Sequence, residues 1–358
     1  MRIFVFEYLT GGGLLANEGA SVDAASLLAE GAVMVTALAA DFARLPQTHV
    51  TVLRDQRATL PVTANVHFRP VAAKEEFDTT LIDESAAADW TVVIAPECDG
   101  ILVSCLERVI AAGGRLLGPG IELARLASDK QATAEHLVRH GVPVPVGCLL
   151  ADYVMGDLAF PLVLKPRDGA GSLGVRLLKS PPVDELPATD AQRLRIEKWR
   201  PGQPASVGVL CGPMGNVALP SCTQRLSDDG HFHYLGGSLP LPPPLAERAQ
   251  HLALRAINTL PQPVGYIGVD LILGPDDSGA EDVVIEINPR LTTSYVGLRA
   301  AARDNLAAAM LAVASGQSPE LTFRPERIEF SASGDVRVIP NAGDSHPPAT
   351  VAVPHATG

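Results

Sequence analysis

Over the first third of the chain, short apolar runs alternate with longer stretches of helical periodicity. The short runs have the length of buried strands and occupy residues 2–6, 49–53, 90–95 and 115–117. The longer stretches are predicted helices at residues 22–42 and 102–112. Strands that alternate with helices are typical of a parallel sheet with helices on both faces, so we expect residues 1–120 to form a Rossmann-like α/β domain.

After residue 120 the pattern changes to strands separated by glycine-rich and proline-rich breaks, which favours an α+β arrangement. Predicted helices occupy residues 129–140, 245–260 and 297–316, and predicted strands occupy residues 161–164, 175–178, 194–199 and 206–210. Residues 268–273 and 282–287 pair plausibly as a hairpin across a turn-rich segment. We therefore divide this part into residues 121–199 (a linker helix and a lid subdomain), residues 200–335, and a tail at residues 336–358 that begins with one edge strand.

Length and composition narrow the class of protein. A chain of 358 residues is long enough for two or three domains. The net charge of −12 argues against binding to nucleic acid, which needs a basic surface. Five scattered cysteines without a CxxC pair indicate neither a disulfide framework nor a zinc site. The apolar stretches at residues 3–6 and 31–40 are too short for a signal peptide or a membrane span, so we expect a cytoplasmic protein with no membrane partner.

The segment Glu286-Ile287-Asn288-Pro289-Arg290, with Asp270 sixteen residues upstream, carries the sharpest chemical signal. Alternation along a strand puts Glu286 and Asn288 on one face, and a hairpin brings Asp270 to that face. Two carboxylates and an amide oxygen are ligands suited to Mg²⁺, with Mn²⁺ as an alternative. The simpler alternative is a solvated hairpin face with charges at alternate positions.

A second motif, PLVLKPRDGAGSLGV at residues 161–175, places Lys165 at the end of a strand before a glycine-rich loop. Glycines let the backbone approach an anion closely, and a serine hydroxyl adds a donor. The loop fits neither a Walker motif nor a dinucleotide fingerprint. We expect a flap over phosphates built from Gly169, Gly171, Ser172 and Gly174, although an isolated hairpin turn would have the same sequence.

Two further signals flank this flap. Lys130 is one of only five lysines, and it follows Ser128 and Asp129 at the start of a predicted helix, from which it would point back toward the flap. Glu197-Lys198-Trp199 ends a predicted strand and could offer hydrogen-bonding groups to a purine. Each pattern alone is also common as a helix cap or a surface strand.

The order of these motifs along the chain resembles the ATP-grasp superfamily over about residues 115–300. The resemblance implies an ATP-grasp fold that holds a nucleotide between two α+β subdomains and follows an N-terminal pre-ATP-grasp domain. It also implies contacts to the phosphates from Lys130 and Lys165, an adenine hinge at residues 197–199, and a catalytic role for Arg290 opposite the transferred phosphate. Members of the superfamily often have a ribose-binding glutamate just after the hinge. This chain departs from that pattern and has Gln203 near that point as the candidate substitute.

A narrower resemblance, to the tyramine–glutamate ligase group of methanofuran-type cofactor biosynthesis, rests on FEYLTGGG at residues 6–13, Glu30-Gly31, Ala95-Pro96-Glu97 and NPRLTTS at residues 288–294. It leads us to expect substrate contacts from these stretches. The expected residues are Gly11, Gly12, Gly13, Glu97, Thr292 and Thr293. The glycines would form a nest of N–H groups for a carboxylate, or merely a βα turn, and Glu97 would hold an amine, or merely cap the next helix.

These patterns together predict an ATP-dependent carboxylate–amine ligase that forms an amide through an acyl phosphate and acts on small molecules. The favoured substrates are glutamate and tyramine or tyrosine. A D-alanine-type or glutamate-tailing ligase, and a nucleotide-binding regulatory protein without turnover, remain as alternatives. The oligomeric state is open, with a homodimer as one option.

Overall fold

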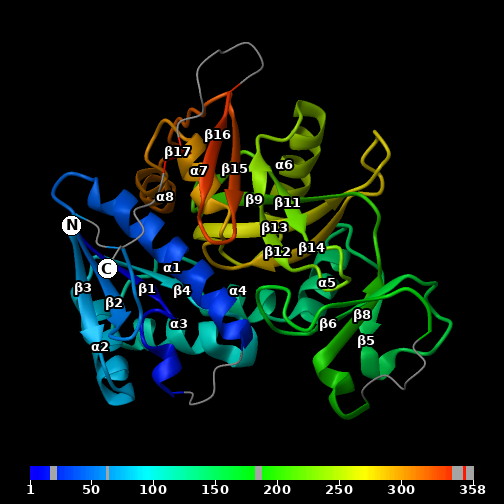
Figure 1. The fold of residues 1–358 in the computed structure, drawn as a ribbon, viewed down its shortest axis with the longest axis horizontal. Helices are drawn as coiled ribbons and strands as arrows, with labels where there is room; N and C mark the ends of the chain where they lie inside the picture. Colours follow the sequence, from blue (N-terminus) through cyan, green and yellow to red (C-terminus); the bar gives the residue numbers. More distant parts are fainter. Residues whose placement is uncertain (17–21, 62–63, 182–187, 341–349, 352–358) are drawn as a thin grey trace.

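The computed structural model describes the chain except for residues 17–21, 62–63, 182–187, 341–349 and 352–358. The described part contains three sheets and eight α-helices (Figure 1). The predicted tail falls largely outside the described residues.

The first sheet is parallel, in the order β3-β2-β1-β4. Its strands are β1 (Arg2–Glu7), β2 (His49–Asp55), β3 (Val66–Val71) and β4 (Trp90–Ile94), and its helices are α1 (Val22–Ala43), α2 (Lys74–Ala87) and α3 (Ile101–Ala111). Alternating side chains of β1 explain why helices cover both faces. Ile3 and Val5 pack with α1, whereas Phe4 and Phe6 pack with α2 and α3. The predicted α/β arrangement is confirmed, but β3 and α2 were not predicted, and residues 115–117 contribute only a bridge from Leu116 to Thr91.

The small sheet, as we call the four strands in the order β5-β8-β6-β7, is antiparallel. It consists of β5 (Gly147–Leu149), β6 (Leu162–Pro166), β7 (Arg176–Leu178) and β8 (Leu194–Lys198). Its own core is small and centres on Leu150, Leu162, Leu164 and Ile196. The small sheet therefore has little apolar packing of its own to hold it rigid.

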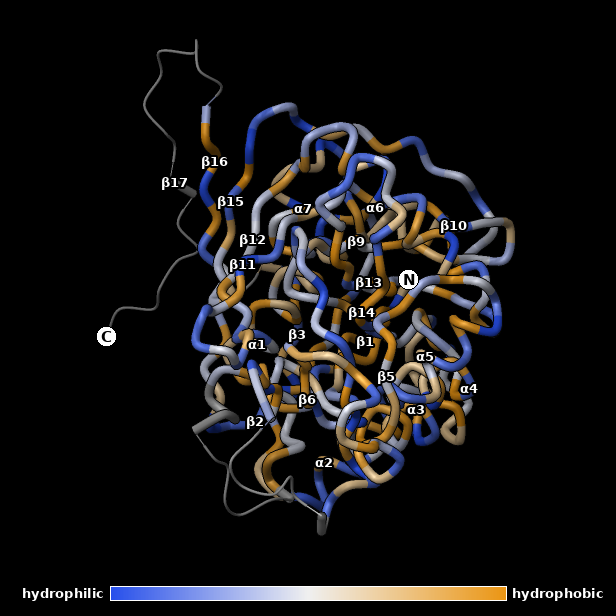
Figure 2. The backbone as a smooth tube through the Cα atoms, turned by 90° about the vertical axis from the view of Figure 1, so that its right-hand side faces the viewer, coloured by the Kyte–Doolittle hydropathy of each residue, from blue (hydrophilic) through white to orange (hydrophobic). Residues whose placement is uncertain are grey.

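The large sheet has nine antiparallel strands in the order β14-β13-β9-β11-β12-β15-β16-β17, with β10 beside β9. The strands are β9 (Gln203–Gly212), β10 (Gly215–Ala218), β11 (Cys222–Leu226), β12 (Tyr234–Leu239), β13 (Gly265–Leu273), β14 (Val283–Asn288), β15 (Arg327–Ser331), β16 (Val336–Ile339) and β17 (Thr350–Val351). The central strands β9 and β13 are almost wholly buried and lie in the middle of the molecule (Figure 2).

The remaining helices pack around the large sheet. They are α4 (Ile121–Ala127), α5 (Lys130–Arg139), α6 (Pro243–Ile257), α7 (Tyr295–Ala301) and α8 (Leu306–Ala314), and short 3-10 turns link other elements at Gly13–Ala16, Cys98–Gly100, Leu150–Asp152 and Ala188–Arg193. Leu123 of α4 and Leu137 of α5 belong to the same core cluster as β9, β13 and α6. The two helices that link the first sheet to the small sheet are thus anchored on the large sheet.

Two predictions for the C-terminal part were wrong. The single helix expected at residues 297–316 is two helices, because Asn305 caps a new helix by accepting hydrogen bonds from the N–H groups of Ala307 and Ala308. The single edge strand expected after residue 331 is replaced by β16 and β17, which extend the large sheet beyond β15.

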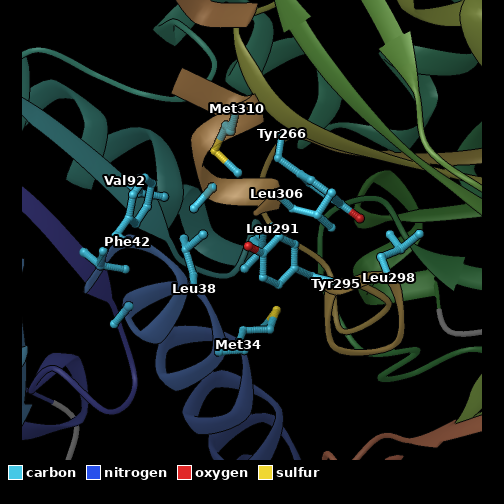
Figure 3. Close-up of a cluster of buried hydrophobic side chains, with 14 of the residues drawn as sticks. Met34, Leu38, Phe42, Val92, Tyr266, Leu291, Tyr295, Leu298, Leu306 and Met310 are labelled. Atoms are coloured by element: carbon cyan, nitrogen blue, oxygen red, sulfur yellow. The ribbon is translucent and has the colours of Figure 1, made fainter. Parts of the chain in front are cut away.

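Helix α1 joins the first sheet to the large sheet through one continuous core. Met34, Leu38 and Phe42 of α1 pack together with Tyr266 and Tyr295 from the other side (Figure 3). The Asp41 carboxylate adds a polar link, since it accepts hydrogen bonds from the Tyr295 hydroxyl at 2.8 Å and from Arg299 Nη2 at 2.6 Å.

The same helix corrects our estimate of its apolar length. The stretch Ser26–Ala43 has 18 residues and a mean hydropathy of 1.5, enough by length and composition to cross a membrane. In this structure 44% of the stretch is buried inside the protein, where its apolar face forms the core just described. The apolar character of α1 is therefore explained by core packing.

Candidate active site

A cleft of about 580 Å³ lies where the small sheet, the large sheet and α1 meet. Most of the residues singled out from the sequence line it. They are Lys130, Lys165, Gly169, Gly171, Ser172, Glu197, Lys198, Trp199, Asp270, Glu286, Asn288, Arg290, Thr292 and Thr293. Gly174, Gln203, Glu97 and the glycines at positions 11–13 do not line it.

The predicted hairpin is formed by β13 and β14, and it places Asp270 directly opposite Glu286. Asn288 lies on the same face and donates its Nδ2 to Asp270 Oδ2 at 3.0 Å. Gln224 of β11 donates to the other oxygen of Asp270 at 2.9 Å. Burial and the neighbouring charge of Glu286 raise the pKa of Asp270 to about 7. Two carboxylates and an amide that converge at a cleft form a hard oxygen donor set, which fits a magnesium ion.

Lys130, at the start of α5, connects this acidic pair to the glycine loop. Its Nζ lies 2.8 Å from Glu286 Oε1 and donates to the Gly169 carbonyl at 2.9 Å. Burial is the largest single influence and lowers the pKa of Lys130, but the charge and hydrogen bond of Glu286, together with the charges of Glu97 and Asp168, outweigh it, so the pKa is raised. The helix start is capped by Asp129, which accepts hydrogen bonds from the N–H groups of Gln131 and Ala132 and also pairs with Arg167 at 2.6 Å.

The glycine loop after β6 needs its glycines for backbone conformation. Gly169, Gly171 and Gly174 have φ values of 138°, 67° and 72°, a region that residues with a Cβ rarely adopt. A Cβ on Gly171 would also lie 2.7 Å from Leu27 Cδ2 of α1. The tip of the loop therefore touches α1, which brings the small sheet against the first domain.

Glu197 of β8 forms two ion pairs within the small sheet. Lys165 Nζ lies 2.6 Å from Glu197 Oε1, and Arg195 Nε lies 2.8 Å from Glu197 Oε2. Lys165 and Glu197 are each 4% exposed, so Glu197 holds Lys165 at the entrance of the glycine loop. Gln203 lies just beyond this region, where its amide donates to the adjacent Pro204 carbonyl, and it stays exposed.

Arg290 is held by Glu97 from the first domain. Arg290 Nη2 donates to Glu97 Oε2 at 3.1 Å, and Arg290 Nε lies 2.8 Å from Glu97 Oε1 without hydrogen-bond geometry, so the pair is an ion pair with one hydrogen bond. Glu97 is 2% exposed, and its side chain makes no capping hydrogen bond to the turn at Cys98–Gly100. The structure thus gives Glu97 a guanidinium as its partner, in place of the helix cap that we had left open.

The glycines at positions 11–13 form a buried turn. Gly11 N–H donates to the Glu7 carbonyl and Gly13 N–H to the Tyr8 carbonyl, at 2.9 and 2.7 Å. The Glu7 carboxylate organises the same turn by accepting hydrogen bonds from Leu9 N and from both N and Oγ1 of Thr10. This geometry is that of a βα turn, and the expected nest for a substrate carboxylate stays a prediction.

Among the cleft residues that the sequence did not assign to the site, Gln224 and Glu30 bear most directly on its charges. Gln224 lies on β11, a strand whose short, weakly alternating sequence gave no signal. The sequence analysis named Glu30 only as part of the Glu30-Gly31 motif. A carboxylate on an otherwise apolar helix face is the signal that could have identified it as a site residue.

Comparisons with known proteins place this geometry in a family. A family model described as an ATP-grasp domain matches residues 127–294, and a model described as a pre ATP-grasp 3 domain matches residues 48–122. A D-alanine–D-alanine ligase of Nitratidesulfovibrio vulgaris is 31% identical over 246 residues, which cover 62% of this chain and 78% of that ligase. The chain belongs to the ATP-grasp superfamily. It is an ATP-dependent carboxylate–amine ligase, which counts against the alternative of a regulatory protein without turnover.

Other ATP-grasp proteins match more of the chain. A tyramine–L-glutamate ligase of Methanocaldococcus fervens is 24% identical over 334 residues, which cover 92% of this chain and 99% of that ligase. Among solved structures, an ATP-grasp superfamily protein of Archaeoglobus fulgidus has a TM-score of 0.68 at 21% identity, covering 98% of this chain and 96% of its own. The ADP complex of an N5-carboxyaminoimidazole ribonucleotide synthetase has a TM-score of 0.66 at 16% identity, covering 94% and 81%. The predicted ATP-grasp fold is confirmed.

Proposed function

We propose that this ligase joins glutamate, as the carboxylate, to tyramine or tyrosine, as the amine, in the biosynthesis of a methanofuran-type cofactor. The observation that carries the proposal is the large share of both chains that one sequence match covers. The tyramine–L-glutamate ligase match spans 92% of this chain and 99% of its relative, so it includes the first domain as well as the nucleotide-binding part. The first domain supplies Glu30 of α1, which lines the cleft, and Glu97, which contacts Arg290.

The chemistry follows from the poor reactivity of a carboxylate toward amines, because an oxide ion is a poor leaving group. In the proposed reaction a carboxylate oxygen attacks the γ-phosphorus of ATP, ADP leaves, and an acyl phosphate forms. The amine nitrogen then attacks the acyl carbon, the carbon–oxygen bond to phosphate breaks, and the amide and phosphate are released. Catalysis by this chain consists of positioning and of neutralising charge.

In this proposal Lys130 and Lys165 bind phosphate oxygens, and the glycine loop closes over them with Gly169, Gly171, Gly174 and the Ser172 hydroxyl. Residues 197–199 form the adenine hinge, with Gln203 near the ribose. Residues 121–199 then act as the lid segment and residues 200–335 as the base of the site. Arg290 faces the transferred phosphate, and the ion pair with Glu97 supports this role because it holds the guanidinium in place.

Asp270, Glu286 and Asn288 would hold the magnesium ion, with manganese as the alternative. When bound, the metal would neutralise phosphate charge. The repulsion between Asp270 and Glu286, which together with burial raises the pKa of Asp270, supports this assignment because a bound cation would relieve it.

A dipeptide ligase of the D-alanine type is the second candidate. It is favoured by the higher identity, 31%, of the D-alanine–D-alanine ligase of Nitratidesulfovibrio vulgaris. That match covers 62% of this chain, however, so it bears less on the part of the site that the first domain contributes.

Product mass spectrometry tests the proposal. The enzyme is incubated with Mg-ATP, glutamate and a panel of amines that includes tyramine, tyrosine and D-alanine, and ADP release is followed in parallel. We expect an amide of glutamate and tyramine or tyrosine. A D-alanyl-D-alanine product would support the second candidate. Glu286→Ala, with an unchanged circular dichroism spectrum, serves as the control without turnover.

A further inference from the structure

Several charged groups of the cleft form ion pairs with a group of opposite sign, but Glu30 does not. Lys130 pairs with Glu286, and Arg290 pairs with Glu97. Glu30 lines the cleft from α1, and its only hydrogen-bond partner among the described residues is the neutral hydroxyl of Thr293, which donates to Oε2 at 2.9 Å. Its Oε1 accepts no hydrogen bond within the described part of the chain. Burial raises the pKa of Glu30, as expected for a carboxylate that lacks a cation.

Glu30 lies near the part of the cleft where the reaction takes place in our proposal. Leu27, one helical turn earlier on the same face of α1, touches the tip of the glycine loop at Gly171. Glu30 also lies close enough to Arg290 for the two charges to influence each other. The N-terminal half of α1 lies between the first sheet and the small sheet (Figure 1). The carboxylate therefore lies on the helix face that meets the glycine loop, within electrostatic reach of the guanidinium that faces the transferred phosphate in our proposal.

We infer that Glu30 and Thr293 form the subsite for the ammonium group of the acceptor, a primary amine. The inference rests on the proposed function, because it assumes that an amine is the second substrate. A primary amine is protonated near neutral pH, and a half-buried carboxylate with one free oxygen is the group that compensates such a charge. The same carboxylate repels a phosphate or a carboxylate substrate, so it keeps the two anionic substrates out of the place reserved for the amine.

The test is Glu30→Gln, which keeps the volume of the side chain and removes its charge. Steady-state kinetics are measured with each substrate varied in turn. We expect the KM for the amine to rise about tenfold to a hundredfold, from the loss of one charge-assisted contact. The KM values for ATP and for the carboxylate should stay within about twofold. Glu329→Gln, which removes a negative charge from β15 outside the cleft, is the matched control and should change none of the three.

A binding measurement separates charge recognition from a loss of structure. Calorimetry in the presence of Mg-ADP compares tyramine with 4-hydroxyphenylethanol, in which a neutral hydroxyl replaces the ammonium group. The substitution Glu30→Gln should weaken the binding of tyramine and leave that of the alcohol unchanged.

Three results would contradict the inference. An unchanged KM for the amine would remove Glu30 from the subsite. A rise confined to the KM of glutamate would place the ammonium of the donor there instead. Equal losses for tyramine and the alcohol would indicate a structural role. If the enzyme uses another primary amine and not tyramine, the proposed substrate is wrong, and the same comparison with that amine and its alcohol still decides the role of Glu30.

Discussion

Replacing Asp270 with asparagine should stabilise the protein in the absence of metal while abolishing its activity. Asp270 and Glu286 face each other across the hairpin, and burial together with this repulsion raises the pKa of Asp270 from 3.8 to about 7. The folded protein therefore binds this proton more tightly than the unfolded chain does. Wild-type stability should be fully retained below about pH 4 and should fall as the pH rises toward 7.

The shift of 7 − 3.8, about three units, corresponds to an upper limit of roughly 4 kcal/mol above pH 7. Because the carboxylate keeps contact with water in the cleft, we expect about 1–3 kcal/mol. Asparagine can keep both hydrogen bonds of Asp270, since its partners Gln224 and Asn288 carry amides that can rotate to present an oxygen.

The assay is urea denaturation with EDTA at pH 5 and pH 8, repeated at pH 8 with Mg-ADP. Asp270→Asn should exceed the wild type in stability at pH 8 without metal, and the order should reverse with Mg-ADP, because only the wild type binds the metal well. Asp282→Asn is the control on the same hairpin. Asp282 is bound by Arg248 Nε at 2.9 Å and by Gly274 N at 2.8 Å, so its neutralisation should destabilise. If the free energy of unfolding depends on pH in the same way in the wild type and in Asp270→Asn, the charge of Asp270 does not affect stability. That result would refute the reasoning.

Three further outcomes are expected. Lys165→Met should weaken ATP binding by about 1.5–3 kcal/mol in calorimetry, whereas the exposed Lys179→Met should not, and equal affinities would remove Lys165 from the phosphate site. Proteolysis at residues 170–173 should slow when Mg-ATP is added, and cleavage that ignores the nucleotide would mean that the glycine loop does not close over it. Glu97→Gln should lower kcat and leave the KM for the amine nearly unchanged if Glu97 orients Arg290, whereas a raised KM for the amine would support the direct substrate contact predicted from the sequence.

The parts of the site that could be predicted are those fixed by local periodicity. The positions of Asp270, Glu286 and Asn288 follow from strand alternation and one hairpin, so the register of β13 and β14 brings them together as expected. The direction of Lys130 follows in the same way from the start of a helix, and its contact with Gly169 agrees with the prediction.

The parts that could not be predicted depend on partners that are distant in sequence. Glu97 has the same local signal whether it caps a helix, holds a substrate or binds Arg290, which lies 193 residues away. The strand β12 was missed because Gly236 and Gly237 give it no apolar pattern, yet a Cβ on Gly236 would lie 2.1 Å from the Phe330 carbonyl of β15. A glycine in the sequence is consistent with such close backbone packing, but it does not show which strand packs against it.

The continuous core around α1 also determines how the protein can be divided. A fragment cut at residue 120 would leave the apolar face formed by Met34, Leu38 and Phe42 without its cover from Tyr266 and Tyr295 (Figure 3). Such a fragment would aggregate rather than fold, so the first sheet and the large sheet form one cooperative unit in unfolding. The small sheet has a separate core of its own, so we expect it to be the segment that opens and closes as substrates enter and products leave.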